Sequence, residues 1–190
     1  TLLNTLPSTF SNVFVDAEGT AYSTCMGKGT DLLKKHSTNG TNLFKNVIAS
    51  SGAFTDVIAD SNGIIYASDS KGYIYVYTRD GELIFCLGEK AGNNDVSGLF
   101  SSLTTIAVDN NGNIWTADGK KGFIQSFTPT EYATTIYKAL QEYENGDYTD
   151  ALKDWNYVLR LNQMSVLAHN GVAKAYYNDE EYDKAMEHFE

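Results

Sequence analysis

The sequence contains few residues of the kinds that form cross-links or bind metals. It has 2 cysteines, 3 histidines and 2 prolines in 190 residues. Cys25 and Cys86 fall in different repeats, so they indicate no disulfide framework, and we expect two buried or half-buried thiols. His36, His169 and His188 lie far apart in the sequence and lack the spacing of zinc ligands. No metal site and no cofactor site is therefore predicted.

Motifs for nucleotide binding and acyl transfer are also missing. Gly27-Lys28-Gly29 precedes a predicted strand and lacks the Gly-Lys-Ser or Gly-Lys-Thr ending that opens the helix of a phosphate-binding loop. Ser23 and Ser68 have no nucleophile-elbow sequence around them. The sequence therefore predicts no catalytic residue, and we expect a protein that is not an enzyme.

Basic residues are scarce, and apolar runs are short. Lys and Arg number 14 against 24 Asp and Glu; residues 131–190 carry 12 acidic and 5 basic residues of these. This balance disfavours nucleic acid and anionic membrane surfaces as partners, because phosphate binding needs basic side chains. No stretch approaches the roughly 18 apolar residues of a membrane helix, and no leader pattern is present. The chain starts without Met inside a strand-rich pattern, so we expect a fragment of a longer protein.

Against these absences stands a repeated unit. Residues 60–69 and 109–118 both read D-x-x-G-x-I-[YW]-x-x-D, and a looser copy at residues 16–22 keeps the Asp, the Gly and the aromatic residue. The leading residues Asp16, Asp60 and Asp109 are 44 and then 49 residues apart. A period of roughly 40 to 50 residues is typical of propeller blades.

Each copy has the chemistry of a β-hairpin. Short β-branched and aromatic runs flank the turn, which predicts strands. Asp60 and Asp109 are placed to accept hydrogen bonds from backbone N–H groups, and Gly63 and Gly112 can take a positive φ. These four are expected to be structural turn residues. The alternative, a cation site built from the carboxylates, requires them to converge, whereas the repeat places them once per blade.

Aromatic residues recur at fixed positions in these copies. Tyr22, Tyr66 and Trp115 occupy one repeat position in the second strand. The tyrosines of the third strand alternate at 73, 75 and 77, so they lie on one face. Packing between blades is the expected role, and a recognition surface is the alternative.

From Val57 to Gly88 the chain resembles NHL-type β-propeller repeats, and the resemblance extends over about residues 10–130. It implies a partial propeller of about three four-stranded antiparallel blades, the last incomplete because Pro129 interrupts the pattern before a fourth strand. Cys25 replaces the second aspartate of the unit in the first copy. We expect two domains, residues 1–130 and 131–190, giving a mixed fold class.

The second domain has a period of 34 residues. Alanine recurs at 139 and 173 and at 151 and 185, and tyrosine recurs at 143 and 177 and at 148 and 182. This length and pattern resemble tetratricopeptide repeats, which implies stacked α-helical hairpins with a groove lined by their first helices. Those helices are expected at about residues 134–144 and 165–177. Asn170, Lys174 and Tyr177 are expected to face the groove, and solvated helix surface is the alternative.

These resemblances imply a non-catalytic scaffold that binds protein, peptide or glycan partners. They are similar to bacterial membrane-linked fusions of propeller and tetratricopeptide repeats, which implies an extracytoplasmic or membrane-associated location for the full-length protein without direct membrane contact in this segment. One alternative is a propeller hydrolase or lyase, such as a gluconolactonase, with a channel metal held by several blades. A structural spacer is the other. Self-association is a further expectation, because a second copy could supply the missing strands.

Overall fold

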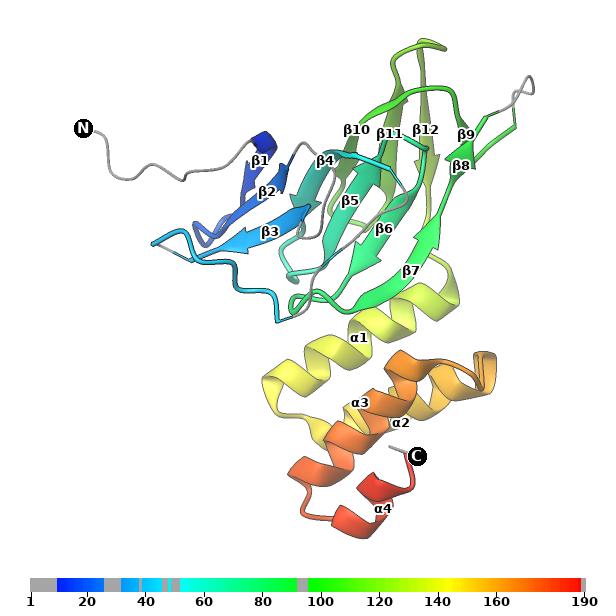
Figure 1. Ribbon diagram of the computed structural model, residues 1–190. Helices are drawn as coiled ribbons and strands as arrows, with labels where there is room; N and C mark the ends of the chain where they lie inside the picture. The colour runs from blue at the N-terminus through cyan, green and yellow to red at the C-terminus, as the bar shows by residue number, and fades with distance from the viewer. Residues whose placement is uncertain are drawn as a thin grey trace. The chain divides into compact units, whose positions relative to one another are not determined.

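In the computed structural model, the chain is described over residues 10–25, 32–37, 39–45, 48, 52–91 and 96–188. It divides into two compact units, Thr1–Thr128 and Pro129–Glu190. The first unit consists of β-sheets and the second of helices (Figure 1). Each unit has its own internal packing and is treated by itself below.

Three antiparallel sheets follow one another along the first unit, each with its strands in chain order. A short parallel pair lies between the second and the third. The strands are β1 Phe10–Val15, β2 Ala21–Cys25 and β3 Leu33–His36; β4 Phe54–Ala59, β5 Ile65–Asp69, β6 Ile74–Tyr77 and β7 Leu83–Leu87; β8 Glu89–Lys90 and β9 Leu99–Phe100; and β10 Leu103–Val108, β11 Ile114–Asp118 and β12 Phe123–Phe127.

Four strands per sheet were expected, and the described residues show four only in the second sheet. The third sheet ends at β12, as the break at Pro129 predicts. The first sheet differs from the expectation, because beyond β3 its described residues form only an isolated bridge between His36 and Asn42. The Asn42 side chain accepts from the backbone N–H groups of Lys35 and Phe44, which ends the ladder locally.

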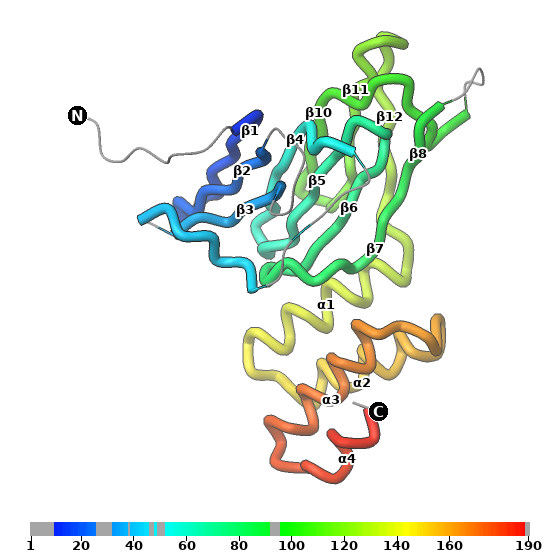
Figure 2. The backbone as a smooth tube through the Cα atoms, in the orientation of Figure 1, coloured from blue at the N-terminus to red at the C-terminus, as the bar shows by residue number. Residues whose placement is uncertain are grey.

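The first strands of the three sheets are neighbours, and the sheets fan out from them (Figure 2). β4 contacts β1 on one side and β10 on the other. All three strands carry a register shift near their start, between Phe10 and Asn12, Phe54 and Asp56, and Leu103 and Thr105. A repeated bulge at one position increases the local twist in the same way each time. The unit is thus propeller-like, with sheets packed face to face.

The core of the first unit lies between the sheets. Tyr22 and Leu33 from the first sheet and Val57 and Ile65 from the second belong to one buried cluster. Along β6 the rings at 73, 75 and 77 contact each other in turn, with centroids 6.2 Å apart in each pair. They therefore share one face, and Tyr77 is 4% exposed. This geometry favours the packing role over the recognition role for these residues.

The second unit contains helices α1 Glu131–Asn145, α2 Tyr148–Leu161, α3 Val166–Asn178 and α4 Tyr182–Met186. Thr130 caps α1 by accepting from the Ala133 N–H, and Ser165 caps α3 in the same way from Ala168. Consecutive helices pack on each other. The alanines at 139, 151, 173 and 185 are buried, which lets the helices approach closely.

Position 180 repeats the backbone geometry of position 146 with a less suitable residue. Gly146 ends α1 with φ 86°, and 34 residues later Glu180 takes φ 62° after α3. The left-handed conformation costs a residue with a Cβ about 1 kcal/mol relative to glycine. We expect Glu180→Gly to stabilise the helical unit by about 1 kcal/mol in urea unfolding. The reverse change, Gly146→Glu, should destabilise it by a similar amount, and an unchanged Glu180→Gly variant would contradict this account.

Candidate functional site

The leading carboxylates of the repeats hold their own turns. Asp60 accepts at Oδ1 from the backbone N–H groups of Asn62 and Ile64, at 2.9 and 3.0 Å. Gly63 completes this turn with φ 78°. The other oxygen, Oδ2, accepts from the Tyr66 hydroxyl at 3.2 Å. The aromatic residue six positions after the aspartate is therefore part of the same unit, a link that the sequence argument did not make.

The third sheet repeats this arrangement with tryptophan in place of tyrosine. Asp109 accepts from the backbone N–H groups of Asn111 and Asn113, at 2.9 and 3.0 Å, and from Trp115 Nε1 at 3.0 Å. Gly112 has φ 77°. In the first sheet, Asp16 accepts from the Thr20 N–H and the Tyr22 hydroxyl. The three carboxylates lie one per sheet.

The second aspartates of the unit fasten each hairpin to the beginning of its sheet. Asp69 is fully buried and accepts from the backbone N–H groups of Gly52, Lys71 and Tyr73, and from the Tyr75 hydroxyl. Asp118 is 2% exposed and accepts from the backbone N–H groups at 101, 102, 120 and 121. These oxygens are engaged with the protein's own donors.

The two equivalent turns differ in their electrostatics. Burial raises the pKa of Asp60 above its ordinary value, against the hydrogen bonds that favour its charged form. Hydrogen bonds from the Asn113 amide and the Trp115 indole lower the pKa of Asp109 to about 2. A depressed folded-state pKa stabilises the protein above the unfolded pKa of about 3.9, and that contribution is lost as the pH falls toward the folded value. For Asp60 the sign is opposite.

We expect Asp109→Asn to destabilise the sheet unit more than Asp60→Asn at neutral pH. An indole N–H only donates, so the new amide nitrogen has no acceptor in Trp115, whereas the Tyr66 hydroxyl can accept from it. Thermal unfolding measures the difference. The loss caused by Asp109→Asn should shrink at about pH 3, because the unfolded wild-type carboxyl is then largely protonated. Equal losses in the two variants would contradict this assignment.

One buried carboxylate joins all three sheets. Asp56 on β4 is 7% exposed; Asn12 Nδ2 on β1 donates to its Oδ1 at 2.5 Å. From β10, Thr105 Oγ1 and the Ile106 N–H donate to its Oδ2 at 2.6 and 3.0 Å. The Val57 N–H supplies a further bond to Oδ1 at 2.9 Å. This clamp was not predicted, although alignment of the repeats places residues 12, 56 and 105 at one position, four before each leading aspartate.

The histidines and cysteines differ in part from the expectations. His169 and His188, 19 residues apart, lie together with their Nδ1 atoms 3.1 Å apart. His36 Nε2 lies 2.6 Å from Ser23 Oγ. Cys25 is buried as expected, but Cys86 is exposed because it lies on β7, the outermost strand of its sheet; neither forms a disulfide bond. Within the described ranges, no group of three or more His, Cys, Asp or Glu side chains is placed to hold a metal ion.

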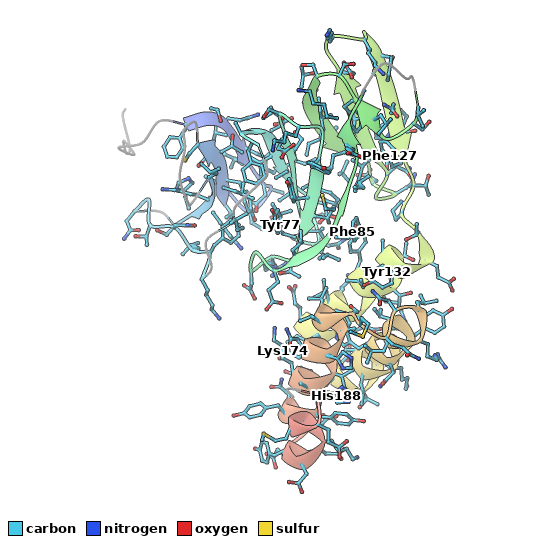
Figure 3. The ribbon with its side chains drawn as sticks, turned by 45° about the vertical axis from the view of Figure 1, so that its right-hand side comes forward. Tyr77, Phe85, Phe127, Tyr132, Lys174 and His188 are labelled. Atoms are coloured by element: carbon cyan, nitrogen blue, oxygen red, sulfur yellow. The ribbon has the colours of Figure 1, made fainter. Side chains whose placement is uncertain are left out.

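The three residues expected to face a groove lie on α3. Asn170, Lys174 and Tyr177 follow the four- and three-residue spacing that places side chains on one helix face. Lys174 is exposed (Figure 3), Tyr177 is 60% exposed, and Asn170 is half-buried.

Two contacts connect this face with its surroundings. The Asn178 amide at the end of α3 donates to the Tyr143 hydroxyl of α1 at 2.7 Å. The Tyr177 ring lies against Tyr182, with centroids 5.3 Å apart. The face is therefore continuous from α1 across α3 to the start of α4. In the part of the chain with described coordinates, no helix combines the length and apolar character needed to cross a membrane.

Comparison with known proteins finds structural similarity only. No protein-family model and no curated protein matches the sequence. A Bacteroides caccae protein of unknown function is similar at TM-score 0.45 and 12% identity, covering 61% of this chain and 44% of that one. The extracellular domain of a putative hybrid two-component system from B. thetaiotaomicron is similar at TM-score 0.43 and 16% identity, covering 63% and 17%. YCF48 from Cyanidioschyzon merolae is similar at TM-score 0.42 and 20% identity, covering 64% and 41%. The chain spans less than half the length of each of these structures.

Proposed function

We propose that this chain is part of a non-catalytic interaction scaffold, in which NHL-type sheets form a rigid body and tetratricopeptide-type helices bind an extended peptide. The observation that carries the proposal is the row of Asn170, Lys174 and Tyr177 on α3. A polar amide, a cation and an exposed aromatic ring on one helix face supply the types of contact that recognise a peptide.

The tetratricopeptide assignment is supported by geometry that repeats after 34 residues. Gly146 and Glu180 share the left-handed backbone conformation, and the alanines at 139 and 173 are both fully buried. The NHL assignment is supported by the repeated turn unit and bulge of the sheets. Neither assignment depends on the similar solved structures.

The proposal that the sheets are not catalytic is supported by the state of their carboxylates. Asp56 and Asp69 are buried, and both oxygens of each accept hydrogen bonds from the protein itself. An acid or base that acts on a substrate needs an oxygen that can reach the reacting group. These two residues therefore serve the structure of the sheets.

The chemistry of the α3 face suggests which peptide fits. The Asn170 amide can pair with the backbone of an extended peptide, Lys174 can bind a carboxylate, and Tyr177 can pack on an apolar side chain. Elsewhere the helical unit is acidic, with 12 acidic and 5 basic residues in 131–190. We therefore expect peptides with one carboxylate near an apolar residue and with basic residues around them.

Selection of linear peptides from a displayed random library against the 190-residue chain tests this function. Peptides of the stated chemistry should be enriched, and Tyr177→Ala should weaken their binding by about tenfold or more in calorimetry, as loss of an aromatic anchor does. Lys174→Ala should also weaken it. Lys153→Ala on α2, also an exposed lysine, is the matched control and should leave affinity unchanged. Enriched peptides that bind all three variants equally would overturn the proposed groove.

We also propose an extracytoplasmic location for the full-length protein, on the basis of the resemblance to membrane-linked repeat fusions. Fractionation of cells that produce the full-length protein tests it. Recovery of the protein on the outer side of the cytoplasmic membrane is the expected result, and recovery only inside the cell would contradict the proposal.

A further inference from the structure

The three sheets of the first unit bury one face position and expose it only at the end of the series. Tyr22 of the first sheet and Tyr66 of the second are 2% and 0% exposed. Trp115, at the same repeat position in the third sheet, is 43% exposed. Ile74 is fully buried, and its equivalent Ile124 is 69% exposed. The third sheet therefore presents an uncovered apolar face, which we call the trailing face and define by Trp115 and Ile124.

The opposite face shows the same contrast at the other end. Val57 of β4 and Ile106 of β10 are 1% and 4% exposed. Val13 occupies their repeat position in β1 and is 65% exposed, and the neighbouring Val15 is 57% exposed. The first sheet therefore presents an uncovered apolar face, which we call the leading face and define by Val13 and Val15.

Within the chain these two kinds of face pack against each other. Tyr22 and Val57 belong to one buried cluster formed where the first sheet meets the second. The second sheet meets the third through contacts of β10 with β4 and β5. Trailing and leading positions are thus already partners at both junctions, so the two uncovered faces have matching chemistry.

The polar positions beside these faces also match. Asn12 and Thr105 occupy the repeat position of Asp56 and each donates to that carboxylate inside the chain. A junction between the third sheet of one copy and the first sheet of another brings the Thr105 and Asn12 positions side by side. An amide and a hydroxyl can pair there without an uncompensated charge.

We propose that a second copy of this chain covers both faces, with the trailing face of each copy packed on the leading face of the other. Two copies together contribute six sheets, which falls within the range of about four to eight that closes a propeller. The interface is head to tail and closes because both copies offer both faces. This inference concerns the sheet unit and is independent of peptide binding by the helices.

Sedimentation velocity of the purified 190-residue chain over a wide concentration range tests the proposal. A reversible dimer is expected. Ile124→Glu and Val13→Glu should each weaken dimerisation by about tenfold or more, because each buries a charge in both junctions of the dimer. Both residues are exposed in the single chain, so thermal unfolding of the monomeric fraction should be little changed. Leu83→Glu, at a residue 51% exposed on β7 and outside both faces, is the matched control.

Mixing the two variants distinguishes this arrangement from a symmetric contact. The Ile124→Glu chain keeps a sound leading face, and the Val13→Glu chain keeps a sound trailing face, so a mixed dimer has one junction without the introduced charges. The mixture should therefore associate more strongly than either variant alone. A wild-type chain that stays monomeric at all concentrations would overturn the proposal, as would a dimer that Ile124→Glu leaves intact. A mixture no stronger than its components would overturn the head-to-tail arrangement.

Discussion

Asp56→Ala should lower the free energy of unfolding of the sheet unit by about 3 kcal/mol, as does removal of one partner from a buried charged network. The side chain of Asp56 is the common acceptor for donors from β1, β4 and β10. Its loss leaves the Asn12 amide, the Thr105 hydroxyl and two backbone N–H groups without that acceptor. Urea unfolding followed by hydrogen exchange in peptides from β4 and β10 measures the effect in this unit.

Two further variants separate the clamp from the general cost of removing an aspartate. Asp56→Asn keeps the shape and one acceptor oxygen, so its loss should lie between those of wild type and Asp56→Ala. Asp80→Ala removes an exposed carboxylate in the turn before β7 and should change stability by less than about 0.5 kcal/mol. If Asp56→Ala behaved like Asp80→Ala, the three-sheet clamp would have no energetic role.

Gly171→Ala should destabilise the helical unit, although alanine favours helices over glycine by about 1 kcal/mol. A Cβ at position 171 of α3 would lie 2.5 Å from Trp155 Cδ2 and 2.7 Å from Nε1. Trp155 on α2 is 2% exposed, so its rigid indole cannot move aside without disturbing the core. We expect a net loss of about 2 kcal/mol in urea unfolding, because overpacking outweighs helix propensity.

A double-mutant cycle isolates this contact. Trp155→Phe shortens the ring system opposite Gly171, and phenylalanine is the residue found 34 positions later, at 189. Gly171→Ala should therefore cost clearly less in the Trp155→Phe background than in the wild type. Stabilisation by Gly171→Ala alone would show that the helices separate easily and that glycine is not required for their approach.

The turns could be predicted from the sequence because their interactions are local. Asp60 contacts groups two, four and six residues ahead, so the spacing of one short motif contains the whole arrangement. The helix end at Gly146 is local in the same sense. Asp56 could not be assigned in this way, because its partners Asn12 and Thr105 lie 44 and 49 residues away. Its position in the repeat is shared with residues of different chemistry, which concealed the carboxylate's role.

The pairing of His169 with His188 escaped the sequence for a related reason. The two residues belong to different helical segments, and their contact depends on how α3 and the residues after α4 pack. Cys86 shows the same limit, since its strand was predicted but its exposure depends on what lies beyond the outermost strand β7.

Repeat period, turn chemistry and the change from strands to helices at Pro129 follow from the order of residues, because they depend on spacing and backbone preference within a few positions. The fate of each apolar residue depends on the fold. Val13 and Val57 have the same place in the repeat, yet one is 65% exposed and the other 1%. Burial requires a neighbouring sheet, and only the packed chain shows which copies of the repeat have one.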